Sequence, residues 1–195
     1  MLLDDPSRLA AYWIHARRTT LPKRLGSPGP DPDQQRVLFE AAAAAPDHDQ
    51  LLPWRFTIVE ASARVRLGEA FAQALLARDP LAAAQDLERA REKALRAPLL
   101  LLVSVDIGPA LGPVPAAERY LSAGCAVQNL LLQAQAMGFA SGLTSGKALE
   151  SAPLRDLFRL NADEHAVCFV SLGTSLQTRP GRPRPAPEAF VRRLA

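Results

Sequence analysis

Two adjacent arginines, Arg17 and Arg18, stand immediately before the hydroxyl-bearing side chain of Thr19. Guanidinium groups make forked, charge-assisted hydrogen bonds that match the geometry of phosphates and carboxylates. Such a pair can also be a solvated helix end, where positive charge offsets the helix dipole. From the residues alone the structural role is the favoured interpretation, and binding of an anion is the alternative.

A second candidate is His48, which lies between two prolines in the segment 46–56, PDHDQLLPWRF. The segment begins where an alanine-rich helix must stop, because the residue before a proline is driven out of the helical region. It ends where a short strand is expected. A corner of this kind either caps a core or lines a site. We expect Trp54 and Phe56 in the core, and from this segment alone a structural role is favoured for His48 over contact with a ligand.

A third candidate is the small-residue segment 142–148, GLTSGKA. A phosphate-binding P-loop needs four residues between its glycines and a Ser or Thr after the lysine. Here three residues separate the glycines and Ala148 follows Lys147, so a nucleotide triphosphatase is not expected. Small residues still allow backbone N–H groups to approach a ligand closely.

Other catalytic patterns are missing from the sequence. The three histidines are scattered and no GxSxG motif is present, so neither a hydrolase triad nor a metal cluster is predicted. Cys125 and Cys168 both lie in apolar surroundings and are predicted to be free thiols. The first residues lack the features of a signal peptide, and no apolar run approaches the ~18 residues needed to span a membrane. We therefore expect a cytoplasmic protein without a membrane partner.

The composition is typical of a soluble globular domain. The chain has 195 residues, of which 48% are hydrophobic and 22% are charged, which predicts one domain. The net charge of +3 is concentrated from Arg179 onward, where five arginines accompany one acid. Binding of nucleic acid by this tail is not expected, because Phe190 is its single aromatic residue and no stacking platform is available.

Hydrophobic periodicity predicts the elements that position these candidates. Ser7 is expected to cap the first helix and Asp33 the second. The apolar run 99–105 predicts a central strand covered on both faces. The helix 116–137 is apolar on nearly all sides, which places it at the domain centre or at a subunit interface. The predicted helices are 8–16, 33–45, 62–77, 81–96, 116–137 and 153–158, and the predicted strands are 56–59, 99–105, 139–143 and 166–172.

The order and spacing of several short motifs resemble the nitroreductase family, and within it the small bacterial YdjA-type subgroup. The resemblance runs from about residue 8 to the end of the chain. The matching motifs are Arg17-Arg18-Thr19, 45–48 with 53–56, 122–126, 138–139 with 145–146, 172–174 and the Pro/Arg-rich tail.

The resemblance implies an α+β fold with a central, mostly antiparallel sheet flanked by helices. It implies a single domain over residues 1–195 and a homodimer that holds two FMN molecules at its interface. The long central helix would pack at the dimer interface, and residues 174–195 would form an arm that reaches the partner subunit. The apolar helix and the Pro/Arg-rich tail both suit this arrangement.

The resemblance also assigns roles to the candidate residues. Arg17, Arg18 and Thr19 match the signature that contacts the phosphate, ribityl chain and ring edge of FMN. His48 matches a position that reaches the flavin from the partner subunit. Leu143, Thr144 and Ser145 match the loop beside the flavin ring. Arg182, or its neighbour Arg184, matches the position in the tail that reaches the phosphate.

The implied activity is an FMN-dependent oxidoreductase that works by a ping-pong cycle. Hydride would pass from NADH or NADPH through flavin N5 to a nitro compound, a quinone or a similar acceptor. The flavin carries the hydride, so no side chain needs to act as a dedicated acid or base.

Two departures from the subgroup pattern leave an alternative open. The ring loop often carries Trp-Arg, where this chain has Leu143-Thr144, and Ala44 stands where a relative can carry arginine. Lys147 could replace the missing cation. The alternative is a flavin-binding protein with little turnover, acting as an FMN carrier or regulator.

Overall fold

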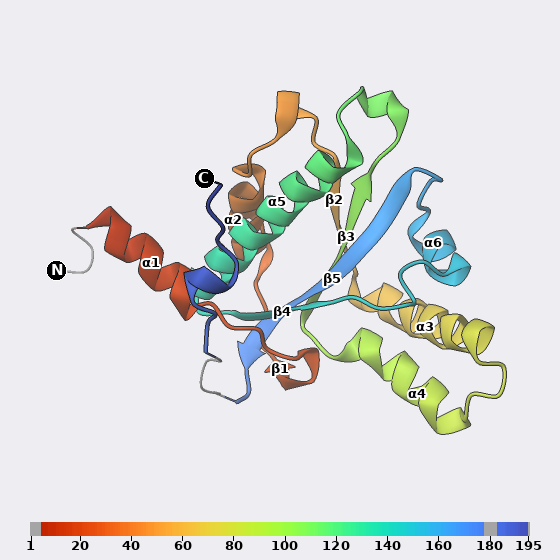
Figure 1. The fold of residues 1–195 in the computed structure, drawn as a ribbon. Helices are drawn as coiled ribbons and strands as arrows, with labels where there is room; N and C mark the ends of the chain where they lie inside the picture. Colours follow the sequence, from red (N-terminus) through yellow and green to blue (C-terminus); the bar gives the residue numbers. More distant parts are fainter. Residues whose placement is uncertain (1–4, 178–182, 195) are drawn as a thin grey trace.

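A five-stranded antiparallel sheet forms the centre of the chain (Figure 1). The computed structural model describes residues 5–177 and 183–194. The strand order is β1-β5-β3-β2, with β4 also paired to β5, and every ladder is antiparallel. The predicted α+β class with a mostly antiparallel sheet is confirmed. The strands are β1 Leu25–Gly26, β2 Trp54–Ile58, β3 Leu99–Asp106, β4 Ala140–Thr144 and β5 Glu164–Ser175.

The central strand β3 supplies side chains to both faces of the sheet. Its odd-numbered residues, from Leu99 to Val105, join one core cluster, whereas Leu100 and Leu102 join a second cluster on the opposite face. Alternation with a period of two is the expected consequence of a pleated strand. The near-continuous apolar run in the sequence is therefore explained by burial on both sides, as predicted.

Helices cover the two faces of the sheet (Figure 1). Residues of α2 and α5 complete the first core cluster, and residues of α3 and α6 complete the second, with α4 packed against α3. Helix α1 projects from the body and has no buried residue. The helices are α1 Pro6–Ala16, α2 Pro32–Ala43, α3 Arg64–Arg78, α4 Ala84–Glu92, α5 Ala116–Ala136 and α6 Ala152–Phe158.

Both predicted helix caps were wrong by two residues. Asp5, not Ser7, caps α1, and Asp31, not Asp33, caps α2 through a capping box with Gln34. In each helix a proline follows the cap directly, and proline suits the first helical position because its missing N–H is not needed there. The predicted helix 81–96 also ends early, because α4 gives way to the 3-10 turn η4, Lys93–Leu95.

Helix α5 has one open side. Its buried residues face α2 and the sheet, whereas Leu121 is 69% exposed and Gly124 and Gln128 are also exposed. A Cβ atom built on Gly124 would meet no atom within 4 Å. The apolar pattern is thus partly explained by the core, and the open stripe leaves a surface for the expected partner helix. The dimer interface itself stays a prediction.

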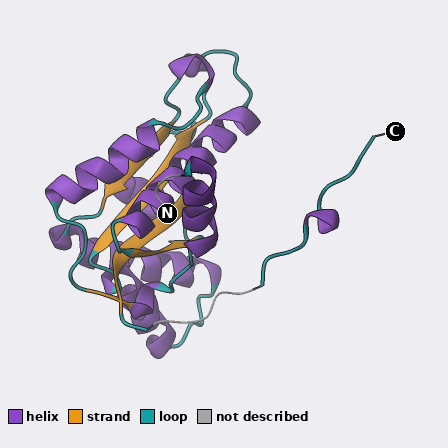
Figure 2. Ribbon diagram, turned by 90° about the vertical axis from the view of Figure 1, so that its left-hand side faces the viewer, coloured by secondary structure: helices purple, strands orange, loops and turns teal. Residues whose placement is uncertain are grey.

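The C-terminal segment leaves the body of the chain (Figure 2). The expected arm begins later than residue 174, because Thr174 and Ser175 belong to β5, where they pair with β1. Arg184 contacts the end of α1 through Arg17, the rest of the segment extends away from the sheet, and Phe190 and Leu194 are exposed. The predicted phosphate ligand Arg182 lies outside the described residues, whereas Arg184 is described.

Candidate functional site

The segment that follows α1 runs along the outer edge of β4. Thr20 donates its backbone N–H to the carbonyl of Ser141 at 2.8 Å, and Thr19 forms a parallel bridge to the same residue. A Cβ atom on Gly142 would lie only 2.2 Å from the carbonyl oxygen of Thr20. Glycine at this position therefore allows the segment carrying Arg17 and Arg18 to lie against the sheet.

Three arginines gather at the start of this segment. Arg184, from the C-terminal arm, donates from Nη2 to the carbonyl oxygen of Arg17 at 3.0 Å, and Arg18 donates to the carbonyl of His15. Partial burial, together with the charges of Arg184 and Arg18, lowers the pKa of Arg17. Among the described residues, no carboxylate forms an ion pair with these three arginines. Their mutual repulsion would be relieved by a bound anion.

A pocket of about 450 Å³ lies at the other end of the same segment. We call it the cationic pocket. Its apolar wall is formed by side chains that include Phe71, Leu75, Leu149 and Phe169. Five cations line it, and no Asp or Glu does. The cations are Lys23, Arg78, Lys93, Arg96 and Lys147.

A buried arginine fixes the part of this pocket that α3 and η4 contribute. Arg64 donates to the backbone carbonyls of Val59, Ala94, Ala97 and Pro98, at distances from 2.8 to 3.2 Å. Burial lowers the pKa of Arg64. Ala94 belongs to η4, and Ala97 and Pro98 link η4 to β3, so this arginine holds in place the turn that presents Lys93 and Arg96.

The structure brings together part of the ring loop predicted from the sequence. Thr144 and Ser145 line the cationic pocket, as do Gly146 and Lys147. Leu143 lies outside its lining and is 43% exposed on β4. Lys147 is therefore a neighbour of the predicted ring loop in space as well as in sequence.

Four of the pocket cations were not predicted from the sequence as site residues. Lys23 lies on the 3-10 turn η1, Pro22–Arg24, and Arg78 is the last residue of α3. Lys93 is the first residue of η4, and Arg96 follows this turn directly. No short motif joins them, and Lys93 and Arg96 lie within the charged segment that was predicted as the helix 81–96. Only the folding of the chain brings these four residues around one pocket, and their spacing in the sequence does not indicate it.

His48 lies far from these residues within one chain. Its Nδ1 is 2.8 Å from the Glu118 carboxylate in the first turn of α5, whereas the end of α1, which Arg17 and Arg18 follow in the chain, lies near the other end of that helix (Figure 1). The turn that carries His48 is strained, with φ of 53° at Asp49 and 56° at Gln50. Strain at non-glycine residues of this kind is concentrated at functional sites.

The electrostatic surroundings of His48 favour its charged form. The hydrogen bond to Glu118, followed by the charge of Asp49, raises the pKa of His48 above its ordinary value. The imidazole is half-exposed. Protonation of this side chain is therefore favoured relative to a free histidine, and the imidazole could turn toward a ligand at the surface of the chain.

The remaining predicted features can be placed briefly. Cys125 and Cys168 are free, and burial raises the pKa of Cys168 to about 11, so that this thiol is inert near neutral pH. Within residues 5–177 and 183–194, no group of His, Cys, Asp or Glu has a metal-binding arrangement. No helix in the same ranges is long and apolar enough to cross a membrane.

A sequence model described as "Nitroreductase family" matches residues 14–174, which is most of the chain. The chain belongs to the nitroreductase family. Two bacterial relatives of this nitroreductase-family protein bear similar names. "Putative NAD(P)H nitroreductase" of Haemophilus influenzae is 35% identical over 155 residues, covering 80% of this chain and 83% of the relative. "Putative NAD(P)H nitroreductase YdjA" of Escherichia coli K12 is 33% identical over 172 residues, covering 86% and 91%.

A solved structure has the same fold as this nitroreductase-family protein. It is the FMN-dependent nitroreductase NfnB of Mycobacterium smegmatis in complex with NADPH. Its TM-score is 0.72 at 19% identity, covering 98% of this chain and 100% of that one. The family and the fold predicted from the order of the motifs are therefore confirmed.

Proposed function

We propose that this protein is an FMN-dependent oxidoreductase that passes hydride from NADH or NADPH to a nitro compound, a quinone or a similar acceptor in a ping-pong cycle. The observation that carries the proposal is the cationic pocket, which is joined by the 17–23 segment to the cluster of Arg17, Arg18 and Arg184 at the other end of that segment. The names of the relatives and of the structural neighbour support the same chemistry.

The residues present suit FMN. Its phosphate needs several cationic donors, and the three arginines of the cluster have no carboxylate partner among the described residues. Its flat ring needs an apolar wall, which side chains such as Phe71 and Phe169 supply. We propose that Arg17, Arg18 and Thr19 hold the phosphate end, and that Thr144 and Ser145, with Leu143 beside them, border the ring.

The chemistry divides between the cofactor and the chain. FMN, when bound, supplies the centre that accepts and donates hydride. The protein would hold Lys23 and Lys147 at the border of the pocket, where positive charge stabilises the negative charge gained on reduction. The ring loop of the subgroup often carries an arginine where this chain has Thr144. These two lysines would supply the positive charge of that arginine. The apolar wall keeps water away and strengthens those interactions.

We further propose that the site is shared between two copies of the chain. Helix α5 has 21 residues, which corresponds to a length of about 30 Å. His48 and the Arg17–Arg18 pair lie near its opposite ends, too far apart to bind one small molecule from a single chain. Two α5 helices packed antiparallel about a two-fold axis would bring His48 of one copy to Arg17 of the other.

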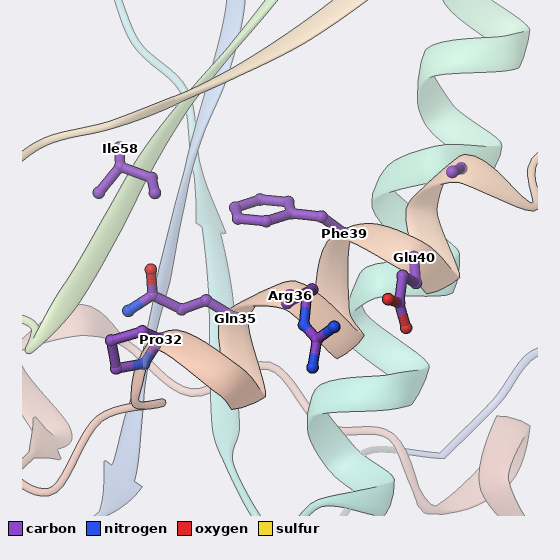
Figure 3. Close-up of a pocket in the computed structure, with 7 residues that line it drawn as sticks. Pro32, Gln35, Arg36, Phe39, Glu40 and Ile58 are labelled. Atoms are coloured by element: carbon purple, nitrogen blue, oxygen red, sulfur yellow. The ribbon is translucent and has the colours of Figure 1, made fainter.

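The C-terminal arm has a surface on which it could lie in such a dimer. A shallow groove of about 480 Å³ runs beside the edge strand β2 and helix α2 (Figure 3). Phe39, Ala43 and Ile58 form its apolar part. The arm carries the exposed apolar residues Phe190 and Leu194. We propose that the arm of one copy covers this face of the other.

Replacement of Leu121 by glutamate should dissociate the dimer without unfolding the chain. The side chain is 69% exposed in the single chain, so a charge there costs little until a second α5 covers it. Sedimentation velocity should show a shift from dimer to monomer of at least tenfold in the dissociation constant, or about 1.4 kcal/mol. Leu81→Glu is the matched control, because Leu81 is 93% exposed on the loop between α3 and α4. Equal dimerisation of the two variants would contradict the proposed interface.

FMN retention should weaken as the pH rises, through the loss of charge on His48. The raised pKa means that the protonated form is fully present below the ordinary pKa of about 6.5 and is lost as the pH passes the raised value. Fluorescence titration of FMN at several pH values measures this. Glu118→Gln should move the transition to lower pH, and His48→Ala should abolish it while leaving thermal stability nearly unchanged. A pH transition in FMN affinity that persists in His48→Ala would show that His48 has only a structural role.

The alternative function, an FMN carrier or regulator with little turnover, is favoured by one observation: Leu143-Thr144 replaces Trp-Arg at the ring loop. Both functions require purified protein to retain FMN or to take it up when it is added. Protein that is colourless after incubation with excess FMN and removal of the unbound flavin would contradict both. We also propose the cytoplasm as the compartment, because free cysteines suit reducing conditions.

A further inference from the structure

The cationic pocket carries more positive charge than the binding of FMN alone requires. Arg78, Lys93 and Arg96 reach it from α3 and from the turn after α4, on the side away from the Arg17–Arg18 cluster. Arg96 has Glu92 at 3.9 Å. Arg78 and Lys93 have no ion pair among the described residues, and both are exposed. Unpaired cations around a concave site attract an anionic ligand and raise its association rate.

The flavin does not account for these cations. Its phosphate is matched by the arginine cluster at the other end of the 17–23 segment, and its ring is uncharged in the oxidised state. The ligand that must enter next is the nicotinamide reductant. NADPH differs from NADH by one phosphate on the 2′ position of the adenosine ribose, and guanidinium and ammonium groups are the side chains that bind such a group.

We propose that Arg78, Lys93 and Arg96 form a subsite for the 2′-phosphate of the reductant, so that this protein prefers NADPH to NADH. The inference rests on the proposed function, since it assigns the reductant of the same site. The preference arises from charge complementarity, because no Asp or Glu lines the pocket that could receive a free ribose 2′-hydroxyl in its place.

The first test compares the rates at which NADPH and NADH reduce the FMN-loaded protein without oxygen. The native protein should be reduced faster by NADPH at equal concentration, and the advantage should shrink with added salt. In Arg78→Gln/Lys93→Gln, the ratio of the two rates should fall about tenfold, as expected for the loss of charged hydrogen bonds. Arg66→Gln is the matched control, because Arg66 is exposed on α3 but does not line the pocket.

The second test needs no turnover. Calorimetry of the FMN-loaded protein should show tighter binding of 2′,5′-ADP than of 5′-AMP, and the double variant should remove the difference. Equal reduction by both nucleotides, a preference for NADH, or equal binding of the two probes would overturn the inference. Protein that binds no FMN, or whose FMN neither nucleotide reduces, would instead overturn the proposed function, and measured FMN content separates the two failures.

Discussion

A protein in which Arg17 and Arg18 are both replaced by glutamine should bind FMN about a hundredfold more weakly than the native protein, which corresponds to about 2.7 kcal/mol. Both arginines lie at the start of the segment that pairs with β4, and Arg184 contacts Arg17 there. The three cations repel one another without a ligand, and partial burial lowers the pKa of Arg17. A phosphate would satisfy all three. Fluorescence quenching of FMN measures the affinity directly.

The control for this variant removes two charges elsewhere. Arg8 and Arg89 are largely exposed, with 72% and 59% of each side chain accessible, and among the described residues each pairs with a neighbouring aspartate. Arg8→Gln/Arg89→Gln should leave the affinity for FMN within about twofold, because exposed ion pairs contribute little and are screened. An Arg17→Gln/Arg18→Gln protein that binds FMN as tightly as this control would show that the arginine cluster does not hold the phosphate.

Replacement of Gly142 by alanine should lower the free energy of unfolding by about 3 kcal/mol, the upper part of the usual range for overpacking. The new Cβ atom would lie 2.2 Å from the carbonyl oxygen of Thr20, and a backbone atom cannot move away as a flexible side chain can. The strain should separate the 17–20 segment from β4. FMN affinity should therefore fall together with stability.

Gly146 provides the matched control for this substitution. It lies shortly after the end of β4, and a Cβ atom built on it meets no atom within 4 Å. Gly146→Ala should change the unfolding free energy by less than about 0.5 kcal/mol, as surface substitutions usually do. Denaturant unfolding of both variants gives the comparison. Similar stability of the two would show that the contact between Thr20 and β4 is not what requires glycine at position 142.

Most elements of the fold could be predicted from the sequence, since the strongest signals were local. The apolar run of β3 and the long apolar pattern of α5 located both elements within one or two residues of their observed ends. The helix starts were misplaced where a proline follows the cap, as at Asp5 and Asp31, because the proline moves the first turn toward the N-terminus.

The site was only partly predictable. Arg17 and Ser145 belong to contiguous motifs, so their residue types and order were informative. Arg78 and Lys93 come from different segments, the end of α3 and the start of η4, and only the packing of α3 and α4 beside the sheet brings them to the pocket. The role expected of His48 needs a second copy of the chain, which no pattern in one sequence can place.

Anaerobic mixing of the FMN-loaded protein with NADPH or NADH, followed by a quinone or a nitroaromatic compound, tests the proposed function most directly. We expect the yellow flavin absorbance to bleach rapidly with the reductant and to return when the acceptor is added, which is the behaviour of a ping-pong flavin oxidoreductase. Tightly bound FMN that neither nucleotide bleaches would contradict the proposed catalytic function and favour the role of an FMN carrier or regulator.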